Sequence, residues 1–423
     1  MRTISKKGLA AVAVGSLALG LLIPAGTAQA DSAPGTNDVV GVGSDTLQYM
    51  LDFGADGDYN GNGGYNVGKA ARLDSIDATP DANARAGYLN GSTNGSLLPL
   101  NPTVVLRAGQ SPVQRPNGSG AGVNALIADT GSPETIDFAR SSSAISAAQV
   151  SAANATIGNV HVVRLAHENL ALATATTTNA PALSKQELFQ IYQCNAGFTT
   201  WNGSGIGATS SDTILPIIPQ LGSGTRKTFL QDIGFTVDSA GNATPALGSC
   251  VRTDEENNPY SLYIQGDNPA TTTPDTDPYQ TGLAANPDAI VPFSGGRLNL
   301  YAAGYFVNPN DTFGVPPKSG DEGVLSPQIK LDNTGTPSDT NAAYNDERGL
   351  YIMFRQSDLT SSAHFNGLAK NWVETLFDNP SGTPFFNSGS GKALLASAGV
   401  TPDYADCGEN PTTGATACGP FNS

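Results

Sequence analysis

The chain has 423 residues, of which 39% are hydrophobic and 14% charged, and its formal net charge is −16. A hydrophobic share of this size can build a packed core, so the composition excludes a wholly disordered chain, and the length suggests two or three domains or lobes. The acidity excludes a protein that binds nucleic acid or anionic membranes through a basic face. Such a face needs an excess of Lys and Arg, whereas the chain has 21 of them against 37 Asp and Glu.

The first 30 residues are typical of a cleaved secretory signal peptide. A basic start with Arg2, Lys6 and Lys7 precedes the apolar stretch 8–23, and residues 28–30, Ala-Gln-Ala, form a small-x-small cleavage site. An N-terminal anchor helix stays the alternative, although the apolar stretch is short for a membrane span. No cysteine near the cleavage point could carry a lipid. We therefore expect a secreted, periplasmic or cell-surface protein, whose charge without the three basic residues of the leader is −19.

Strand-like and helix-like segments alternate along the rest of the chain. The expected strands are 39–43, 103–107, 136–139, 160–165, 170–174, 214–219 and 350–354, and the expected helices are 45–53, 121–128, 144–153, 185–193, 226–233 and 367–377. This alternation predicts an α/β fold with a mostly parallel sheet. The stretches 257–288 and 308–346 are rich in Pro, Asp, Thr, Gly and Asn, and we expect them to be long surface loops.

The chain has four cysteines, an even number, which can all pair as disulfides if the protein is exported to an oxidising compartment. Of the three possible pairings, we favour Cys407 with Cys418, which are close in sequence, and Cys194 with Cys250. A zinc site made of all four is the alternative, although CxxC spacings are absent.

Three turns rich in glycine and serine each follow an expected strand and open an expected helix. They are 43–46 (Gly-Ser-Asp-Thr), 118–122 (Gly-Ser-Gly-Ala-Gly) and 222–225 (Gly-Ser-Gly-Thr), and 140–143 (Arg-Ser-Ser-Ser) lies in a similar position. Helix N-termini expose unpaired N–H groups, glycine lets the backbone approach a ligand, and hydroxyls add donors. Several such turns at the carboxyl ends of strands predict an anion site. For any one turn alone, the alternative is that Ser and Asp only cap the helix.

The order of these motifs resembles that of the periplasmic phosphate-binding proteins that serve ABC importers. The motifs are GVGSDTL (41–47), NGSGAGVNALIA (117–128), IDFARSSS (136–143), LSKQELFQIYQ with a following Trp-Asn (183–202) and QLGSGTRKTFL (220–230). The resemblance covers about 39–230, with a weaker similarity at 286–297 and 350–354. It implies a type II periplasmic-binding-protein fold: two lobes, each a mostly parallel sheet flanked by helices, with two crossing strands as hinge. Lobe one would be 36–173 plus 352–423, and lobe two 174–351.

Carried over by position, the resemblance implies that donors in the turns bind the ligand: Asp45, Thr46, Ser119, Ser223, Gly224 and Thr225. Two positions depart from the family, because its ligand-accepting aspartate is Ser142 here and its arginine is Pro219. Arg140 and Arg226 are candidate sources of positive charge, and Asp45 is a candidate acceptor that would favour protonated phosphate over sulfate. Alternatively, both arginines face solvent or bridge the lobes.

The implied function is that of an exported, monomeric solute-binding protein. It would close its lobes on inorganic phosphate or another small oxyanion and deliver it to the membrane subunits of an ABC importer, without a cofactor and without catalysis. A secreted phosphatase-like hydrolase acting at the same anion site stays an alternative, although Ser119 and Ser223 lack the G-x-S-x-G elbow. A secreted surface protein that keeps the lobes without transport is another.

Four further expectations concern polar and aromatic residues outside the turns. Asp56, Asp58 and Asn60 match the first ligands of a calcium loop, but position twelve is Val67, so a polar turn is the alternative. We expect Glu187 and the run 254–256 (Asp-Glu-Glu) to be solvated. His161 and His167 should have structural roles, and Trp201 and Trp372 should pack in the core.

Overall fold

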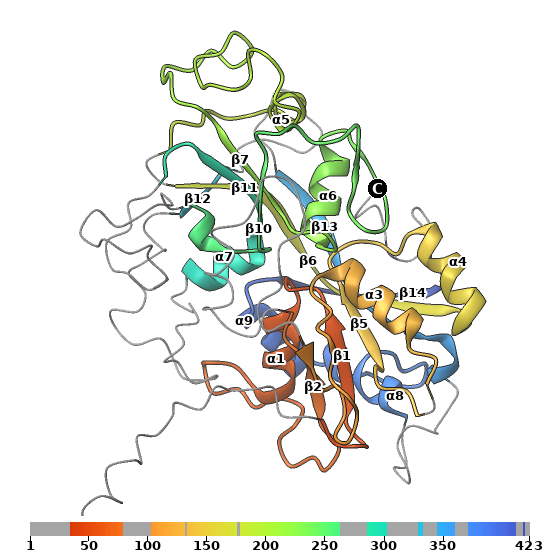
Figure 1. Ribbon diagram of the computed structural model, residues 1–423. Coiled ribbons are helices and arrows are strands. Elements are labelled where there is room, and N and C mark those ends of the chain that lie inside the picture. Colours follow the sequence, from red (N-terminus) through yellow and green to blue (C-terminus); the bar gives the residue numbers. More distant parts are fainter. Residues whose placement is uncertain are drawn as a thin grey trace, which may run out of the picture. The chain divides into compact units, whose positions relative to one another are not determined.

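The computed structural model describes residues 34–78, 103–131, 133–175, 178–262, 286–302, 329–332, 345–359, 371–411 and 418. All of these residues belong to one unit of the chain, Ala33–Ser423. Their main feature is a ten-stranded sheet with the strand order β10-β7-β11-β6-β13-β5-β1-β2, and β12 and β14 also pair with β6 (Figure 1). The predicted signal peptide lies outside the described residues.

The sheet has two parallel halves. In the first half, β1 (Val39–Gly43) lies between β2 (Leu73–Ser75) and β5 (Phe138–Ser141) and runs parallel to both. In the second half, β7 (Leu215–Pro219) lies between β10 (Arg252–Asp254) and β11 (Ala289–Ser294), again parallel to both. Strands β1, β5 and β11 are buried along their whole length, as expected where helices cover both faces of a parallel sheet.

Two long antiparallel strands join the halves. Strand β6 (Val160–Ala175) pairs with β13 (Asn345–Arg355), and β6 then reaches β11 of the second half while β13 reaches β5 of the first. The expectation of two separate strands at 160–165 and 170–174 is therefore wrong. The polar residues between them do not end the strand, because Glu168 lies opposite Arg348 of β13 and forms an ion pair with it. Two parallel halves joined by two crossing strands are the type II arrangement that the resemblance implies.

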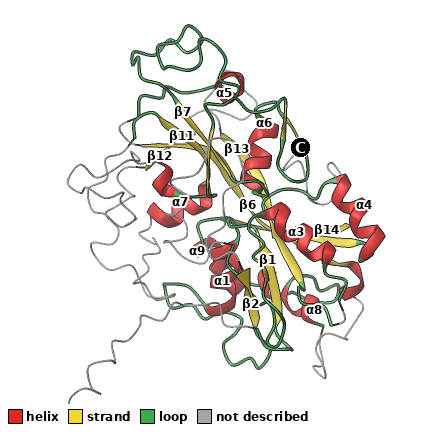
Figure 2. Cartoon of the chain, viewed as in Figure 1, coloured by secondary structure: helices red, strands yellow, loops and turns green. Residues whose placement is uncertain are grey.

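Helices lie on both sides of the sheet (Figure 2). Helix α1 packs against α9, and α3 packs against α4. Their ranges are α1 Gln48–Asp56, α3 Ser119–Ala128, α4 Ala147–Thr156, α5 Lys185–Tyr192, α6 Gly224–Asp232, α7 Gly295–Ala302, α8 Trp372–Leu376 and α9 Gly389–Ser397, with 3-10 turns at Pro259–Leu262, Gln356–Leu359 and Phe385–Asn387. No helix in these ranges is long and apolar enough to cross a membrane.

Short strands complete the fold and correct two expectations. They are β3 Thr103–Val104 with β4 Val113–Gln114, β8 Thr236–Val237 with β9 Ala243–Thr244, β12 Ile329–Asp332 and β14 Thr401–Glu409. The strand expected at 103–107 is thus only two residues long. The expected loop 308–346 contains β12, which pairs with β6; the remainder of that loop up to residue 344 lies outside the described residues.

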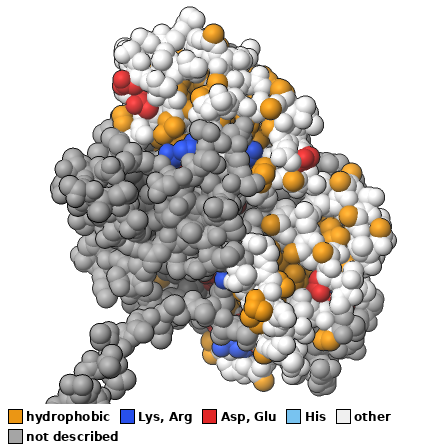
Figure 3. All heavy atoms as spheres, viewed as in Figure 1, with side chains coloured by type: hydrophobic (Ala, Val, Ile, Leu, Met, Phe, Trp, Pro, Cys, Tyr) orange, Lys and Arg blue, Asp and Glu red, His pale blue; other side chains and the backbone are white. Residues whose placement is uncertain are grey.

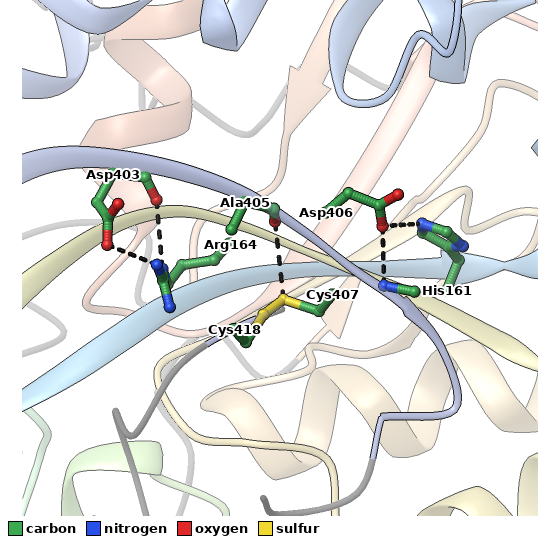
Figure 4. The surroundings of a disulfide bond; sticks show 8 residues. His161, Arg164, Asp403, Ala405, Asp406, Cys407 and Cys418 are labelled. Carbon is green, nitrogen blue, oxygen red and sulfur yellow. Dashed lines mark hydrogen bonds and ion pairs between the residues drawn. A yellow bond between two sulfur atoms is a disulfide. The ribbon is translucent and has the colours of Figure 1, made fainter. Parts of the chain in front are cut away.

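The cysteines form the two predicted disulfides, Cys194–Cys250 and Cys407–Cys418. No thiolate is left for the four-cysteine zinc alternative, since all four sulfur atoms are used. Figure 4 shows that the second bond ties Cys407 of β14 to Cys418 near the C-terminus, and that an ion pair links Arg164 of β6 to Asp403 of β14.

Buried side chains confirm several expected packing roles. Trp201 and Trp372 are almost fully buried in two different core clusters. His161 is buried and hydrogen-bonded to Gln356 and Asp406, so its role in the described structure is to hold β14 against β6. On the face drawn in Figure 3, charged side chains of the described residues are sparse.

Candidate functional site

The glycine-rich turns meet where the first and second halves of the sheet approach each other. Residue Gly43 at the end of β1 bridges to Asn117, which precedes α3. The N–H of Gly120 donates to the carbonyl of Gly222 at 2.9 Å. Gly118 has a φ of +101°, and a β-carbon on it would lie 2.5 Å from the oxygen of Gly222. Only glycine permits both this backbone conformation and this close approach. The turns at 118 and 222 are therefore in direct contact.

Serine hydroxyls form a buried cluster between these turns. The hydroxyls of Ser119 and Ser142 lie 3.2 Å apart, and the N–H of Ser142 donates to Ser119 Oγ at 2.9 Å. Ser44 Oγ donates to Ser142 Oγ at 3.3 Å. The start of α6 closes the cluster, because a β-carbon on Gly224 would overlap both the Ser119 and the Ser142 hydroxyls. Three predicted ligand positions, Ser119, Ser142 and Gly224, thus lie together.

Residue Ser223 caps α6. Its side chain accepts a hydrogen bond from the N–H of Arg226 at 3.0 Å, which is the N-cap pattern. In this structure, Ser223 therefore caps the helix, as the alternative interpretation of the turn expects. The N–H of Thr225, two residues after Ser223, has a different partner.

That partner is the carboxylate of Glu256. Its Oε1 accepts from the N–H of Thr225 at 3.2 Å, from the Thr225 hydroxyl, and from the hydroxyl of Thr46 at 3.2 Å. Both threonines are predicted ligand residues, one from each half of the sheet. An oxyanion that belongs to the chain itself therefore lies at the start of α6, where the helix dipole and the free N–H groups favour negative charge.

The burial of Glu256 corrects a sequence expectation. Residues Asp254, Glu255 and Glu256 were expected to be solvated, but they are 0%, 1% and 0% exposed. They belong to a segment that begins at the last residue of β10 and that we call the acidic loop, residues 254–258. The loop is buried because polar groups from both halves of the sheet receive its side chains. Glu187, the other acid expected in solvent, caps α5 through Ser184.

The acidic loop connects the two halves through three neighbouring residues. The carboxylate of Glu255 accepts from the side-chain amide of Asn117 at 2.9 Å, and Glu256 accepts from Thr46. The side-chain amide of Asn257 donates to Asp45 Oδ2 at 3.0 Å. Because Asn117, Thr46 and Asp45 belong to the first half and the loop belongs to the second, these bonds hold the halves together.

The positive charge at this junction comes from two arginines that the sequence reasoning missed. Arg297 in the first turn of α7 forms an ion pair with Asp45, with 3.2 Å between Nη2 and Oδ2. Arg348 of β13 binds Glu168 with 2.6 Å between Nη2 and Oε1, and also donates to Thr46 Oγ1 at 3.1 Å. A signal for Arg297 was present, because residues 294–297, Ser-Gly-Gly-Arg, repeat the pattern of a strand followed by a glycine turn and a helix.

The two predicted arginines lie elsewhere. Arg140 is fully buried and donates to the carbonyls of Gly43, Ser44 and Ile76 and to the hydroxyl of Ser75. Arg226 donates to the carbonyls of Gly241 at 2.7 Å and Pro219 at 2.9 Å. Neither faces solvent, and each bonds within its own half of the sheet, so in this structure both guanidinium groups hold backbone turns in place.

Burial changes the acidity of groups at the junction. It raises the pKa of the Glu256 carboxyl, and the charge of Asp45 raises it further, while Arg348 and the hydrogen bonds from Thr225 lower it. Burial also lowers the pKa of Arg226 to about 10. The net direction for Glu256 is upward, because the cost of burying its charge exceeds the help from its donors.

A small polar pocket opens beside the serine cluster. Its lining includes Ser119, Ser143, Ser223 and Lys227, and its empty volume is about 280 Å³. This volume includes open solvent, and the space left for water has room for about one molecule. The ammonium group of Lys227 donates to the carbonyl of Ala144 at 3.1 Å, and burial lowers its pKa. The pocket as described is too small for a tetrahedral oxyanion.

The candidate calcium loop is occupied by protein donors. Asp58 accepts from the backbone of Asn60 and Asn62 at 3.0 and 2.9 Å, and its other oxygen accepts from the Asn62 amide and the Ser397 hydroxyl. Asp56 forms an ion pair with Arg72 at 3.0 Å. These are the contacts of a polar turn that fixes the end of α1.

Comparisons with known proteins place the chain in a family. A family model described as a PBP superfamily domain matches residues 78–307, more than half of the chain. Similar solved structures include a putative phosphate ABC transporter substrate-binding protein from Clostridium perfringens (13% identity, TM-score 0.47, covering 87% of this chain and 100% of that one). Another is an ABC-type phosphate transport receptor from Vibrio cholerae (13% identity, TM-score 0.45, covering 86% and 99%). A search of curated proteins gives no match. On the strength of the family model, this chain belongs to the PBP superfamily.

Proposed function

We propose that this protein is an extracytoplasmic solute-binding protein that captures a small oxyanion, phosphate first among the candidates, for delivery to an ABC importer. The observation that carries the proposal is the contact between Glu256 and the start of α6. A carboxylate and a phosphate are both oxyanions that accept from N–H and O–H donors. Donors from Thr225 and Thr46 already hold one such group.

A second observation supports an anion at this place. Nη1 of Arg348 is buried and has no hydrogen-bond partner among the residues that the structure describes. A buried guanidinium nitrogen without an acceptor is costly, and an anion near Thr46 would supply one. Arg348 would then take the part that the family gives to the arginine replaced here by Pro219.

Binding would proceed by movement of two lobes without chemical change of the ligand. The proposed lobes are 36–173 plus 352–423 and 174–351, whose limits fall inside β6 and β13. Parting of the halves would break the bonds of the acidic loop and widen the serine-lined pocket. Closure on an anion would bring donors of α3 and α6 onto it and exclude water, so that selectivity follows from the match of donors and acceptors.

The remaining predicted site residues receive roles within this scheme. Ser119, Ser142, Ser223 and Gly224 would line the anion site, and Thr46 and Thr225 would donate to the anion directly. Asp45 would hold Arg297 in position, since it is already paired with that residue. Arg140 and Arg226 would keep the turns rigid.

A serine hydrolase has no supporting contact in the described part of the chain. Such an enzyme needs a base next to a serine hydroxyl. His161 is bonded to Asp406 and Gln356, and His167 to Asp403, so both of these histidines are engaged with strand β14 and the turn after β13. His364 lies outside the described residues.

Titration calorimetry and thermal unfolding with phosphate, sulfate, a phosphonate, a nucleotide and a sugar test the proposal. An anion that binds only the folded protein should stabilise it by about 2.7 kcal/mol at a hundredfold excess over Kd. Thr225→Val should weaken binding at least tenfold, because it removes a hydroxyl donor at the start of α6. If no oxyanion binds at pH 5 or pH 7.5, the proposed function is wrong.

A further inference from the structure

We propose that Glu256 is an internal competitor for the oxyanion: its carboxylate occupies the anion position, and an external anion binds only after that carboxylate is protonated or displaced. The inference rests on the proposed function and adds regulation to the same site. It starts from the three hydrogen bonds that Glu256 Oε1 accepts from Thr225 and Thr46.

The donors that hold Glu256 cannot serve a second anion at the same time. A backbone N–H has one hydrogen to donate, and so has each threonine hydroxyl. An external phosphate at the start of α6 would need the same hydrogens, and its charge would stand next to that of the carboxylate. Occupation by Glu256 therefore excludes the ligand both by geometry and by repulsion between like charges.

The loop is held so that Glu256 reaches the site. The N–H of Glu256 donates to Gln220 Oε1 at 2.7 Å, and Asn257, which follows, has a φ of +52°. Asn257 Oδ1 accepts from the N–H of Ser294 at 2.9 Å. These contacts fix the backbone on both sides of Glu256, so the carboxylate is directed by the fold and not by chance rotation of a surface side chain.

The hydrogen bonds of Glu256 also join the two halves of the sheet when no ligand is bound. Glu256 reaches Thr46, which is 210 residues away and belongs to the first half of the sheet. An external anion must therefore replace contacts that already join the halves. Its apparent affinity is lowered by the fraction of molecules in which Glu256 is in place, as for any ligand that binds a minor state.

Two charged groups act on Glu256 directly: Asp45 before α1 raises its pKa, and Arg348 of β13 lowers it. The other charges nearby are bound to different partners, because Arg297 of α7 pairs with Asp45, Glu168 of β6 pairs with Arg348, and Glu255 accepts from Asn117. Burial and Asp45 together raise the pKa of Glu256, which places its protonation closer to neutral pH than for an ordinary glutamate. Acidification should therefore remove the negative charge from the anion position and weaken the hold of Glu256 on its donors.

The test compares purified wild-type protein with Glu256→Gln, which keeps the shape of the side chain and removes its charge. Calorimetric titrations with sodium sulfate run from pH 5 to pH 8, since sulfate keeps the same charge over this range and any pH dependence belongs to the protein. Phosphate is titrated in parallel. Glu374→Gln in α8 makes the same change of net charge away from the site and serves as the matched control.

We expect Glu256→Gln to bind sulfate at least tenfold more tightly than wild type at pH 7.5, with little dependence on pH. Wild type and Glu374→Gln should share one affinity, which rises as the pH falls. Glu255→Gln, which removes the neighbouring charge, should gain less than Glu256→Gln. Equal affinities and equal pH profiles for wild type and Glu256→Gln would overturn the inference while leaving the proposed function intact.

Two further outcomes are distinguishable. If neither wild type nor Glu256→Gln binds any oxyanion at any pH, the proposed function itself fails. If Glu256→Gln does not fold, the pH dependence of sulfate binding to wild type decides alone: affinity that rises on acidification supports internal competition, and affinity that is constant or falls contradicts it.

Discussion

Replacing Gly224 with alanine tests whether the turns are packed as tightly as the structure describes. Gly224 is the first residue of α6, so its backbone is helical and alanine adds no backbone strain. The added β-carbon, however, would overlap the hydroxyls of Ser119 and Ser142. These hydroxyls are buried and have little room to turn away, because Ser119 Oγ is also held by the N–H of Ser142 at 2.9 Å.

Gly224→Ala should change the free energy of unfolding through two destabilising effects and one stabilising effect. Overpacking a buried site costs about 1–3 kcal/mol, and losing the Ser119–Ser142 hydrogen bond adds about 0.5–1.5 kcal/mol. The lower flexibility of the unfolded alanine chain returns up to about 1 kcal/mol. We therefore expect the free energy of unfolding to fall by about 0.5–4.5 kcal/mol, and anion binding to weaken because the start of α6 is displaced.

Urea unfolding, followed by circular dichroism with the disulfides oxidised, measures this change. Gly389→Ala is the matched control, because Gly389 is likewise the first residue of a helix, α9, and a β-carbon there meets no atom within 4 Å. The control should be neutral or stabilising by up to about 1 kcal/mol.

A double-mutant cycle decides whether the overlap is the cause. Ser142→Ala removes one of the two hydroxyls, so Gly224→Ala should cost at least about 0.5 kcal/mol less in that background. Equal costs in both backgrounds would refute the reasoning, because the loss would then not arise from contact between residues 224 and 142.

Three other predictions concern the Arg348–Glu168 ion pair, Asp74 and the Cys194–Cys250 disulfide. Arg348→Met should lower the free energy of unfolding by about 3–5 kcal/mol, because it leaves the buried Glu168 carboxylate without its ion-pair partner, and adding Glu168→Gln should recover most of the loss in the same unfolding assay. Asp74 has a pKa raised to about 7, mainly by burial, so the folded protein holds this proton more tightly than the unfolded chain and loses stability as the pH rises from about 4 to about 7. Asp74→Asn should remove that loss, stabilising the protein by about 1–2 kcal/mol at pH 8 after allowance for its partial exposure and leaving pH 4 unchanged; an equal effect at both pH values would contradict the assignment. Replacing Cys194 and Cys250 by alanine should cost about 4 kcal/mol, since their disulfide closes a loop across a separation of 56 residues, and a melting temperature unchanged from wild type would contradict this.

Local patterns in the sequence predict much of the fold. Short β-rich runs followed by Gly-Ser turns correctly indicate β1 and β7 with the helices that follow them, and a run of serines follows β5 in the same way. Strand, turn and helix start are each determined within a few residues. Closeness in sequence likewise predicts the disulfide between Cys407 and Cys418, which are only 11 residues apart. Local patterns fail at β6, where polar residues suggest a break that cross-strand pairing with β13 prevents.

The sequence by itself determined the acidic composition, the α/β alternation and the turns that supply backbone donors, since each depends on neighbouring residues. Only the tertiary structure decided what faces those donors. Glu256 reads as a solvated acid in sequence, yet it contacts Thr46 across 210 positions and Thr225 across 31. Arg297 and Arg348 bind acids 252 and 180 positions away. Contacts of this range leave no local periodicity, because they depend on how two halves of a sheet come together and on which charges must be paired once water is excluded.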